Sequence, residues 1–288
     1  MWLPGCYWTR MKFYIILCIC CLYVLQGVGQ EPDGRNTLIR SEGTSVLVRI
    51  VPPWGYTRIG VKEGSFGEYL RNLPLRSHGS RVHYFDGGEK RNRKVYCAVV
   101  DLDIGNRDLQ QCADAVIRLR AEYLYHRKAY DKIHFNFTNG FRADYTKWAE
   151  GYRISVKGNR VSWYKAKEED YSYPTFRAYL NVVFAYAGTL SLAKELVPVS
   201  IDAMQIGDVF IQGGSPGHAV IVIDMAIDKV TGNKLYLLAQ SYMPAQDIHV
   251  LNNLQNGNIS PWYDLKSTGR VMTPEWTFVT GDLKRFKD

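Results

Sequence analysis

Residues 207–224 read GDVFIQGGSPGHAVIVID and carry the strongest structural signal of the chain. A short apolar strand and a glycine-rich turn lead into a longer apolar strand, and His218 stands where the second strand begins. The sheet would hold the backbone of this histidine, while the turn would leave space beside its ring. General-base chemistry needs this combination of rigidity and access, so His218 is the first candidate for a functional residue.

The segments around this hairpin predict an α+β fold with a single domain over residues 44–288. Two long helices are expected at about 108–130 and 174–196, and Pro174 suits the first turn of the second helix. An antiparallel sheet would follow in the C-terminal part, with strands at residues 208–212, 219–227, 234–240, 246–251 and 275–280. No linker rich in Pro, Gly or Ser divides the chain into two domains.

The region before the first long helix predicts short elements. Residues 45–51 have the composition of a strand, and two prolines end it. Capping-box spacing predicts a short helix over residues 65–70. Residues 82–85 and 95–102 flank a glycine-containing basic loop, which favours a broad hairpin.

The N-terminal segment predicts export. Lys12 precedes the apolar run 13–25 and small residues follow it, which is typical of a secretory signal over residues 1–29. The run is shorter than the roughly 20 residues of a membrane-spanning helix, so no stable transmembrane segment is expected after signal removal. Met11 offers an alternative start, and the polar residues 30–43 would form a flexible lead-in. We therefore expect the protein in the periplasm, in the cell envelope or outside the cell.

The charge pattern does not indicate a nucleic-acid partner. The formal net charge is +8, but the basic residues are spread along the chain apart from clusters at residues 90–94 and 284–287. No nucleic-acid-binding motif accompanies these clusters, and such runs are usually solvated faces. No two histidines have the spacing of a metal motif, so we expect neither a metal nor another cofactor.

Cysteine usage leaves one candidate nucleophile. Four of the six cysteines precede the expected cleavage site, which leaves Cys97 and Cys112. Cys97 would lie about 20 Å down its strand from the connecting loop and Cys112 about 9 Å along its helix, beyond the roughly 7 Å that a disulfide tolerates between Cα atoms. Cys112 is therefore expected to be a free thiol.

Cys112 also has a structural interpretation, as a small apolar residue of the core. It shares an apolar stripe at helical spacing with Leu109, Val116, Leu119 and Tyr123. In a helix that starts at Asp108 it would lie more than one turn from the N-terminus, where the helix dipole has faded.

The strand that pairs with His218 should supply a polar neighbour for its ring. The turn at residues 228–233 returns the chain, so that folding about this turn places His218 opposite residues 241–243. Gln240 and Ser241 both come within one or two residues of that position. Which of them faces the ring depends on the register, because a slip of one residue reverses the faces of a strand.

The stretch around His218 resembles the histidine-bearing half of papain-like cysteine hydrolases, in particular the NlpC and CHAP groups that cut cell-wall peptides. The resemblance covers about a quarter of the chain. It implies a papain-like fold and a peptide or peptidoglycan-like substrate. It also implies a Cys112 nucleophile, a His218 base and Gln240 as the orienting residue. Gln-Cys at the head of a helix resembles the CHAP nucleophile turn, in which Gln111 would help to hold an oxyanion, with Gly217 and Ser241 at the same site.

One departure from that pattern favours a different function. In NlpC-type hydrolases the nucleophile helix comes shortly before the strand that corresponds to residues 208–212. Residues 171–180 take that place here and contain no cysteine. The alternative to a hydrolase is therefore a catalytically inactive module that binds peptide or glycan.

The chain as a whole resembles a family of uncharacterised exported proteins, a domain of unknown function, from gut Bacteroidota. The stretches that carry this resemblance are DLDIG at 101–105, QCADA at 111–115, NGFR at 139–142 and AQSYMPAQ at 239–246. The resemblance implies export as one full-length unit and no particular activity.

Overall fold

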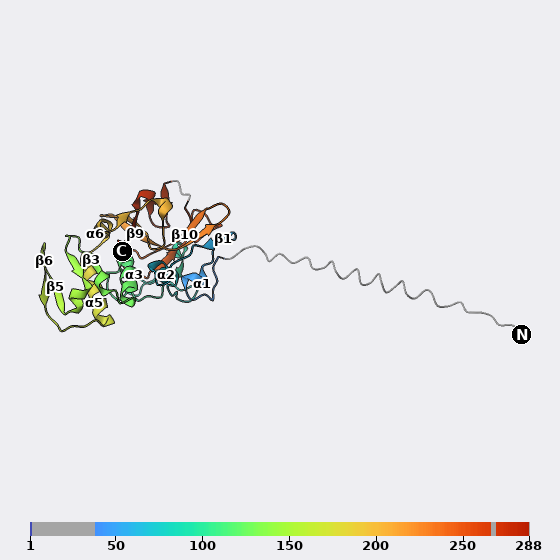
Figure 1. Cartoon of the computed structure of the whole chain (residues 1–288). Coiled ribbons are helices and arrows are strands. Elements are labelled where there is room, and N and C mark those ends of the chain that lie inside the picture. The colour runs from blue at the N-terminus through green and yellow to red at the C-terminus, as the bar shows by residue number, and fades with distance from the viewer. Residues whose placement is uncertain (2–37, 266–268, 288) are drawn as a thin grey trace. The chain divides into compact units, whose positions relative to one another are not determined.

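The fold is built on a nine-stranded sheet that collects strands from both ends of the described chain. The computed structural model describes Met1 and residues 38–265 and 269–287 (Figure 1). Contacts between Cα atoms separate Thr37–Asp288 as one compact unit. Residues 2–29 of the predicted signal segment and residues 30–37 of the lead-in lie outside the described residues.

All pairings in the large sheet are antiparallel, and β9 lies at its centre. The strand order is β2-β11-β10-β9-β8-β15-β7, while β1 also pairs with β9 and β12 with β10. The bounds are Tyr56–Arg58 (β1), Tyr96–Val99 (β2), Val197–Pro198 (β7), Val209–Gln212 (β8), His218–Asp228 (β9), Lys234–Gln240 (β10), His249–Leu251 (β11), Tyr263–Asp264 (β12) and Leu283–Arg285 (β15).

The apolar run of β9 is explained by burial on both faces of the sheet. Ala219 and Ile221 contact the larger apolar core, which also contains the buried residues of α3. Val220 and Val222 contact a second core on the other face. Alternate side chains of a strand point to opposite faces, so a strand covered on both sides needs apolar residues at every position.

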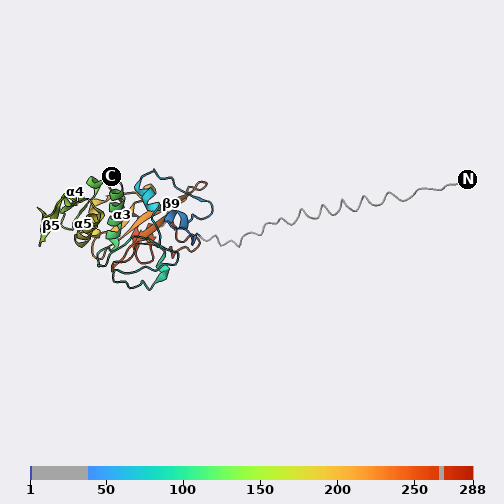
Figure 2. The same ribbon diagram turned by 90° about the horizontal axis from the view of Figure 1, so that it is seen from below.

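Within the described residues six α-helices accompany the sheet, and α3 packs along β9 (Figures 1 and 2). They are Val46–Arg49 (α1), Phe66–Arg71 (α2), Cys112–His126 (α3), Tyr145–Ala149 (α4), Tyr173–Tyr186 (α5) and Thr189–Glu195 (α6). Short 3-10 turns occur at Arg93–Val95, Tyr130–Lys132, Ile201–Ala203 and Thr280–Asp282.

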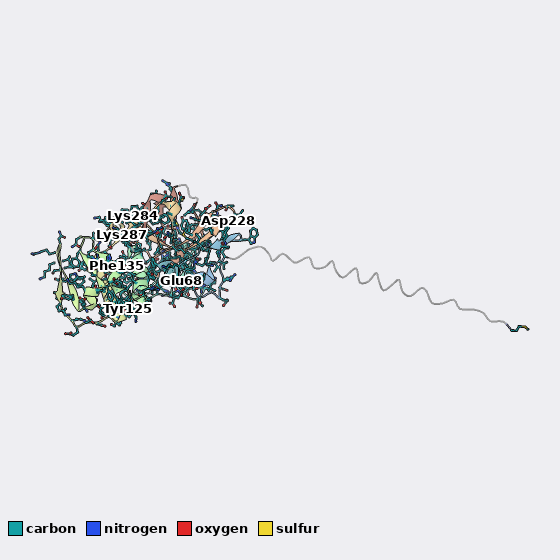
Figure 3. The ribbon with its side chains drawn as sticks, viewed as in Figure 1. Glu68, Tyr125, Phe135, Asp228, Lys284 and Lys287 are labelled. Atoms are coloured by element: carbon teal, nitrogen blue, oxygen red, sulfur yellow. The ribbon has the colours of Figure 1, made fainter. Side chains whose placement is uncertain are left out.

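Three two-stranded sheets complete the described elements. They pair β3 (His134–Asn136) with β4 (Arg142–Asp144), β5 (Tyr152–Lys157) with β6 (Arg160–Lys165), and β13 (Arg270–Met272) with β14 (Thr277–Val279). Aromatic side chains join two of the helices, since Tyr125 of α3 stacks on Phe176 of α5 with ring centroids 4.3 Å apart. Figure 3 labels Tyr125 together with Phe135 of β3, and both belong to the larger core or contact it.

A buried carboxylate ties the N-terminal elements to the centre of the sheet. Asp224 of β9 is fully buried and accepts hydrogen bonds from Nε of Arg58 (2.6 Å) and Nε of Arg71 (2.7 Å). Arg58 belongs to β1 and Arg71 ends α2. Because a buried charge is costly without partners, this pair of arginines fixes both elements against β9.

The predicted fold class, papain-like with two long helices before a C-terminal sheet, is wrong. The structure consists mostly of antiparallel sheet with six short helices, and β1, β2 and β7 enter the large sheet from earlier in the chain. The helix expected at 174–196 is two helices, because Ala187 and Gly188 are extended between α5 and α6. The helix expected at 108–130 contains only residues 112–126, and Lys128 follows it with a φ of 54°.

The region before α3 also differs from its prediction. Residues expected to form a strand at 45–51 contain the short helix α1. At its start the N–H of Val46 donates to the carbonyl of Leu73, and at its end the carbonyl of Arg49 accepts from the N–H of Arg40. The expected hairpin between 82–85 and 95–102 is absent from the described residues. Its second arm, β2, pairs instead with β11, so the edge of the large sheet satisfies its backbone groups.

Candidate functional site

The helix α3 begins at Cys112, later than the sequence predicts. Asp108 does not cap a helix; its Oδ1 accepts hydrogen bonds from the backbone N–H of Ala245 (2.7 Å) and from Nε2 of Gln111 (2.9 Å). The backbone N–H of Gln111 donates to Oδ2 of Asp114 (3.1 Å), so the cap forms three residues further on. Cys112 is therefore the first helical residue, a position where the helix dipole favours a thiolate.

The Cys112 thiol lies against the strand that begins with His218. Cys112 begins α3, which packs on β9. Burial, and then the charge of Asp114, raise the pKa of Cys112 to about 11, and the backbone N–H of Ala219, the residue next to His218, is among the groups that oppose this rise. The thiol is therefore protonated at neutral pH. Both described cysteines, Cys97 and Cys112, are free, as predicted.

Gln240 contacts the imidazole of His218. Its Oε1 lies 2.8 Å from Nε2 of His218, and Ala239 of the same strand pairs with Ile221 of β9. Continuing this register places His218 opposite residue 242, so Gln240 is a diagonal neighbour on the same face. A bulge between Leu237 and Leu238 sets this register.

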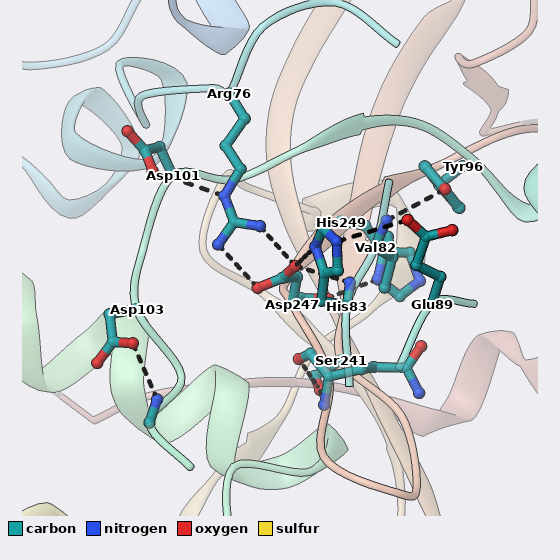
Figure 4. Close-up of polar contacts among 12 residues, drawn as sticks. Arg76, Val82, His83, Glu89, Tyr96, Asp101, Asp103, Ser241, Asp247 and His249 are labelled. Carbon is teal, nitrogen blue, oxygen red and sulfur yellow. Dashed lines mark hydrogen bonds and ion pairs between the residues drawn. The ribbon is translucent and has the colours of Figure 1, made fainter. Parts of the chain in front are cut away.

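The orientation of the Gln240 amide is fixed by its other partners. Its Nε2 donates to Oε2 of Glu275 (2.7 Å) and lies 3.4 Å from Nε2 of His249. Nδ1 of His249 donates to the carbonyl oxygen of Asp247 (2.8 Å; Figure 4), so Nε2 of His249 is an acceptor. With the amide nitrogen directed at these two acceptors, the amide oxygen must face His218. The hydrogen of the His218 ring is then on Nε2, and Nδ1 keeps its lone pair.

A buried lysine completes this network. Nζ of Lys90 lies 2.7 Å from Oε1 of Glu275 and 2.9 Å from Oε1 of Gln246, and it stands 5.5 Å from the ring centroid of Tyr242. Lys90 is 4% exposed, so its ammonium depends on these partners. The chain Lys90–Glu275–Gln240–His218 therefore connects a fixed positive charge to the imidazole.

Aromatic side chains cover the His218 ring, which is 2% exposed. The ring centroids of Tyr242, Trp276 and Phe278 lie 4.8, 5.3 and 5.9 Å from that of His218. Burial lowers the pKa of His218 to about 4; the Gln240 hydrogen bond opposes this change and the Lys90 charge adds to it. Both Cys112 and His218 are thus uncharged at neutral pH.

Three other residues were predicted for the site. The side chains of Ser241 and Gln111 are bound to other parts of the chain, and Gly217 is required by the turn before β9. Oγ of Ser241 lies 2.7 Å from the carbonyl oxygen of Gln246 and 3.0 Å from that of Gln110, away from the imidazole. The side chain of Gln111 is bound to Asp108. At Gly217 a Cβ atom would lie 2.5 Å from Oγ1 of Thr189 and 2.6 Å from the carbonyl oxygen of Gly214, so the turn before β9 needs a glycine there.

Sequence reasoning missed four residues of the network, namely Lys90, Tyr242, His249 and Glu275. Lys90 lies in a basic cluster that the sequence suggests is solvated, and His249 stands in an unremarkable strand. Glu275 is separated from Gln240 by 35 residues. A pairing across that distance has no local signal in the sequence.

Two further features were searched for in the described part of the chain, a metal site and a membrane-spanning helix. There, no three His, Cys, Asp or Glu side chains are grouped in a way that would hold a metal ion. Over the same residues, every helix is too short or too polar to cross a bilayer.

Comparison with known proteins gives one match. No curated protein and no solved structure is significantly similar to the chain. The family DUF4846, described as "Domain of unknown function (4846)", matches residues 46–285, which include β1 to β15 and the whole network around His218. The chain therefore belongs to the DUF4846 family.

Proposed function

We propose that this protein is a cysteine hydrolase of peptide or amide bonds, with Cys112 as the nucleophile, His218 as the general base and Gln240 as the orienting residue. The observation that carries the proposal is the pairing of His218 with Gln240, in which Nε2 of the ring lies 2.8 Å from Oε1 of the amide and Nδ1 is left unprotonated. Cys112 begins α3, the helix that packs on the strand opened by His218. The resemblance of the His218 stretch to NlpC and CHAP hydrolases supports the same three roles at the level of the motif.

In the proposed reaction the thiol and the imidazole both start uncharged. Nδ1 of His218 takes the thiol proton as the sulfur attacks the carbonyl carbon, and Gln240 stabilises the imidazolium through its amide oxygen. The backbone N–H groups of Cys112 and Ala113 lie at the start of α3 and stabilise negative charge on the sulfur. They are the candidate oxyanion donors. The imidazolium then returns its proton to the leaving amine, and water releases the acyl group from sulfur.

The burial of His218 favours one alternative, a catalytically inactive module that binds peptide or glycan. A ring that is 2% exposed under three aromatic side chains has little room for a substrate carbonyl. On this alternative Cys112 packs as a small apolar residue at the start of α3, and the network around Gln240 holds the sheet together.

Export and a peptidoglycan-like substrate belong to the same proposal. The pattern of a basic residue, an apolar run and small residues over 1–29 supports secretion. A peptide hydrolase delivered to the envelope would meet cell-wall peptides there. This part rests on the sequence pattern and on the resemblance alone.

The rate of alkylation by iodoacetamide at neutral pH distinguishes the hydrolase from the inactive binding module. In the native protein, mass spectrometry of the Cys112 peptide gives the rate, and Cys97 is an internal control because burial raises its pKa to about 12. General-base catalysis typically contributes a factor of about 10²–10⁴, so His218→Asn should slow Cys112 alkylation by about a hundredfold. Equal rates in the two proteins, or reaction of Cys112 only after denaturation, would support the binding module.

Hydrolysis is then measured directly. Purified sacculi and a fluorescent casein are incubated with the wild-type protein and with Cys112→Ala, and newly formed amino groups are counted. We expect release by the wild-type protein and none by the variant. If both proteins form amino groups equally, Cys112 is not the nucleophile.

A further inference from the structure

A cavity of about 410 Å³ lies away from the His218 ring, between the loop 101–107 and the helix α5. Tyr173, Arg177 and Asn181 line it from one face of α5, since they are spaced four residues apart. Arg118 of α3 forms the floor. The volume falls within the usual range for small-molecule sites, roughly 300–1,000 Å³.

Arg177 lacks a partner in this cavity. Its guanidinium makes no hydrogen bond or ion pair with any residue in the described ranges, and its Nη1 is buried without a partner. Burial, and then the neighbouring charge of Arg118, lower the pKa of Arg177. A guanidinium with unused donors beside a second positive charge is suited to an anion, and its planar shape matches a carboxylate.

Arg118 lines the same cavity, and its guanidinium, unlike that of Arg177, has hydrogen-bond partners. Its Nε donates to Oε1 of Glu122 (2.6 Å), its Nη1 to Oε1 of Gln110 (2.9 Å), and its Nη2 to the hydroxyl of Tyr173 (3.1 Å). Glu122 is buried and also accepts from Tyr173 (2.8 Å). The charge of Arg118 is therefore balanced by Glu122, and the positive charge that remains available belongs to Arg177.

Two carboxylates, those of Asp101 and Asp103, lie in the loop 101–107, which also lines the cavity (Figure 4). Asp101 is 65% exposed and lies 3.6 Å from Nε of Arg76. Asp103 uses Oδ1 to accept from the backbone N–H of Gly105 (3.1 Å). Arg107 adds an exposed positive charge at the rim. The cavity is thus lined by an arginine without a hydrogen-bond partner and by acidic groups, of which Asp103 is near enough for its charge to oppose the fall in the pKa of Arg177.

We propose that this cavity binds a small zwitterionic ligand of the amino-acid or short-peptide class. The carboxylate of the ligand pairs with Arg177 and receives a hydrogen bond from the amide of Asn181, and its ammonium group faces Asp103. The proposal does not depend on the chemistry of Cys112.

Isothermal titration calorimetry with glycylglycine, acetate and inorganic phosphate tests the proposal, and Cys112→Ala is used throughout so that no turnover occurs. Glycylglycine should bind more tightly than acetate or phosphate. Arg177→Gln should weaken glycylglycine by at least about tenfold, since it removes a charge-assisted pair. Asp103→Asn should weaken glycylglycine and leave acetate unchanged. Arg160→Gln, on the exposed strand β6, is the control that should change nothing.

A second variant keeps the test valid if Arg177→Gln folds poorly. Asn181→Asp places a carboxylate four residues after Arg177 on the same helix face, so the protein supplies its own anion. We expect a higher melting temperature together with loss of glycylglycine binding. The proposal fails if none of the three probes binds, if phosphate binds most tightly, or if Asn181→Asp retains full glycylglycine affinity. If glycylglycine binds to Cys112→Ala and the wild-type protein shows no hydrolysis, the binding site is supported and the proposed hydrolase is contradicted.

Discussion

Oε1 of Gln240 lies 2.8 Å from Nε2 of His218, and this contact determines which ring nitrogen carries the hydrogen. The amide oxygen can only accept, so Nε2 must donate. Glu275 holds the amide in this orientation from the other side at 2.7 Å. The imidazole therefore presents an unprotonated Nδ1, as a general base toward a thiol requires.

The first prediction concerns the state of the His218 ring. Long-range ¹H–¹⁵N correlation spectra should show hydrogen on Nε2 and none on Nδ1, and titration should give a pKa of about 4, because burial disfavours the imidazolium. The His218→Asn spectrum identifies the signal by its loss. Hydrogen on Nδ1 at neutral pH would contradict the assigned network.

The second prediction makes Glu275 a positioning residue. Glu275→Gln replaces one of the two acceptor oxygens with an NH2 group, so the side chain can no longer accept from both Gln240 and Lys90, and the buried Lys90 loses its carboxylate. We expect a loss of about 1–3 kcal/mol in the free energy of unfolding, measured in urea, because the carboxylate is partly exposed and the full cost of breaking a buried pair is reduced.

A purely structural role for Glu275 would change stability alone. A positioning role also changes the His218 tautomer and slows Cys112 alkylation, so both are measured in the same variant. Glu89→Gln breaks a pair with Arg81 in which both side chains are about half exposed, and it should change unfolding by less than about 1 kcal/mol. Unchanged alkylation and an unchanged tautomer in Glu275→Gln would reduce Glu275 to a structural partner.

The sequence predicted the parts of the fold that have local signals. The apolar runs and turn residues around 207–240 located β8, β9 and β10, and the capping box located α2 with Ser65 Oγ accepting from the N–H of Glu68. Edge strands as short as β1 and β7 depend on long-range pairing, and nothing in their own residues distinguishes them from loops. The sequence therefore predicted too few strands for the antiparallel sheet and helices that are too long.

In the candidate site, too, the contacts with a local signal in the sequence could be predicted and the long-range contacts could not. The local turn of the hairpin places both Gln240 and Ser241 near His218 and leaves the choice between them to the register; in the structure Oε1 of Gln240 lies 2.8 Å from Nε2 of His218. The start of α3 was misplaced because Asp108, a typical cap, binds the backbone of Ala245 instead. That contact joins residues 137 positions apart, and it decides whether Cys112 lies at the first position of the helix or more than a turn inside it.

The third prediction tests the buried carboxylate at the centre of the sheet. Asp224→Asn leaves Arg58 and Arg71 without their charged partner, so unfolding in urea should become easier by about 3–5 kcal/mol. Asp144→Asn is the matched control, because in its pair with Arg142 the two side chains are 33% and 55% exposed, and such a pair contributes less than about 1 kcal/mol. Equal losses in the two variants would mean that Asp224 contributes no more than a surface pair.

The fourth prediction concerns acid stability and His249. Burial lowers the pKa of His249 to about 3, against an ordinary value of 6.5, so the unfolded chain binds the proton first as the pH falls. The stability from keeping His249 neutral is complete above pH 6.5 and is lost as the pH falls toward about 3, at about 1.4 kcal/mol per pH unit. Burial raises the pKa of Asp114 and of Glu195, and these groups change stability in the opposite direction.

The useful quantity is therefore the difference in unfolding free energy between the wild-type protein and His249→Gln, in which the contributions of Asp114 and Glu195 cancel. Glutamine can still donate to the carbonyl of Asp247 and accept from Gln240, so the variant should fold. The wild-type advantage should shrink by about 1.4 kcal/mol for each pH unit between 6.5 and 4.5, measured by urea unfolding at several pH values. A difference that stays constant over this range would mean that the His249 ring takes up its proton as readily in the folded protein as in the unfolded chain.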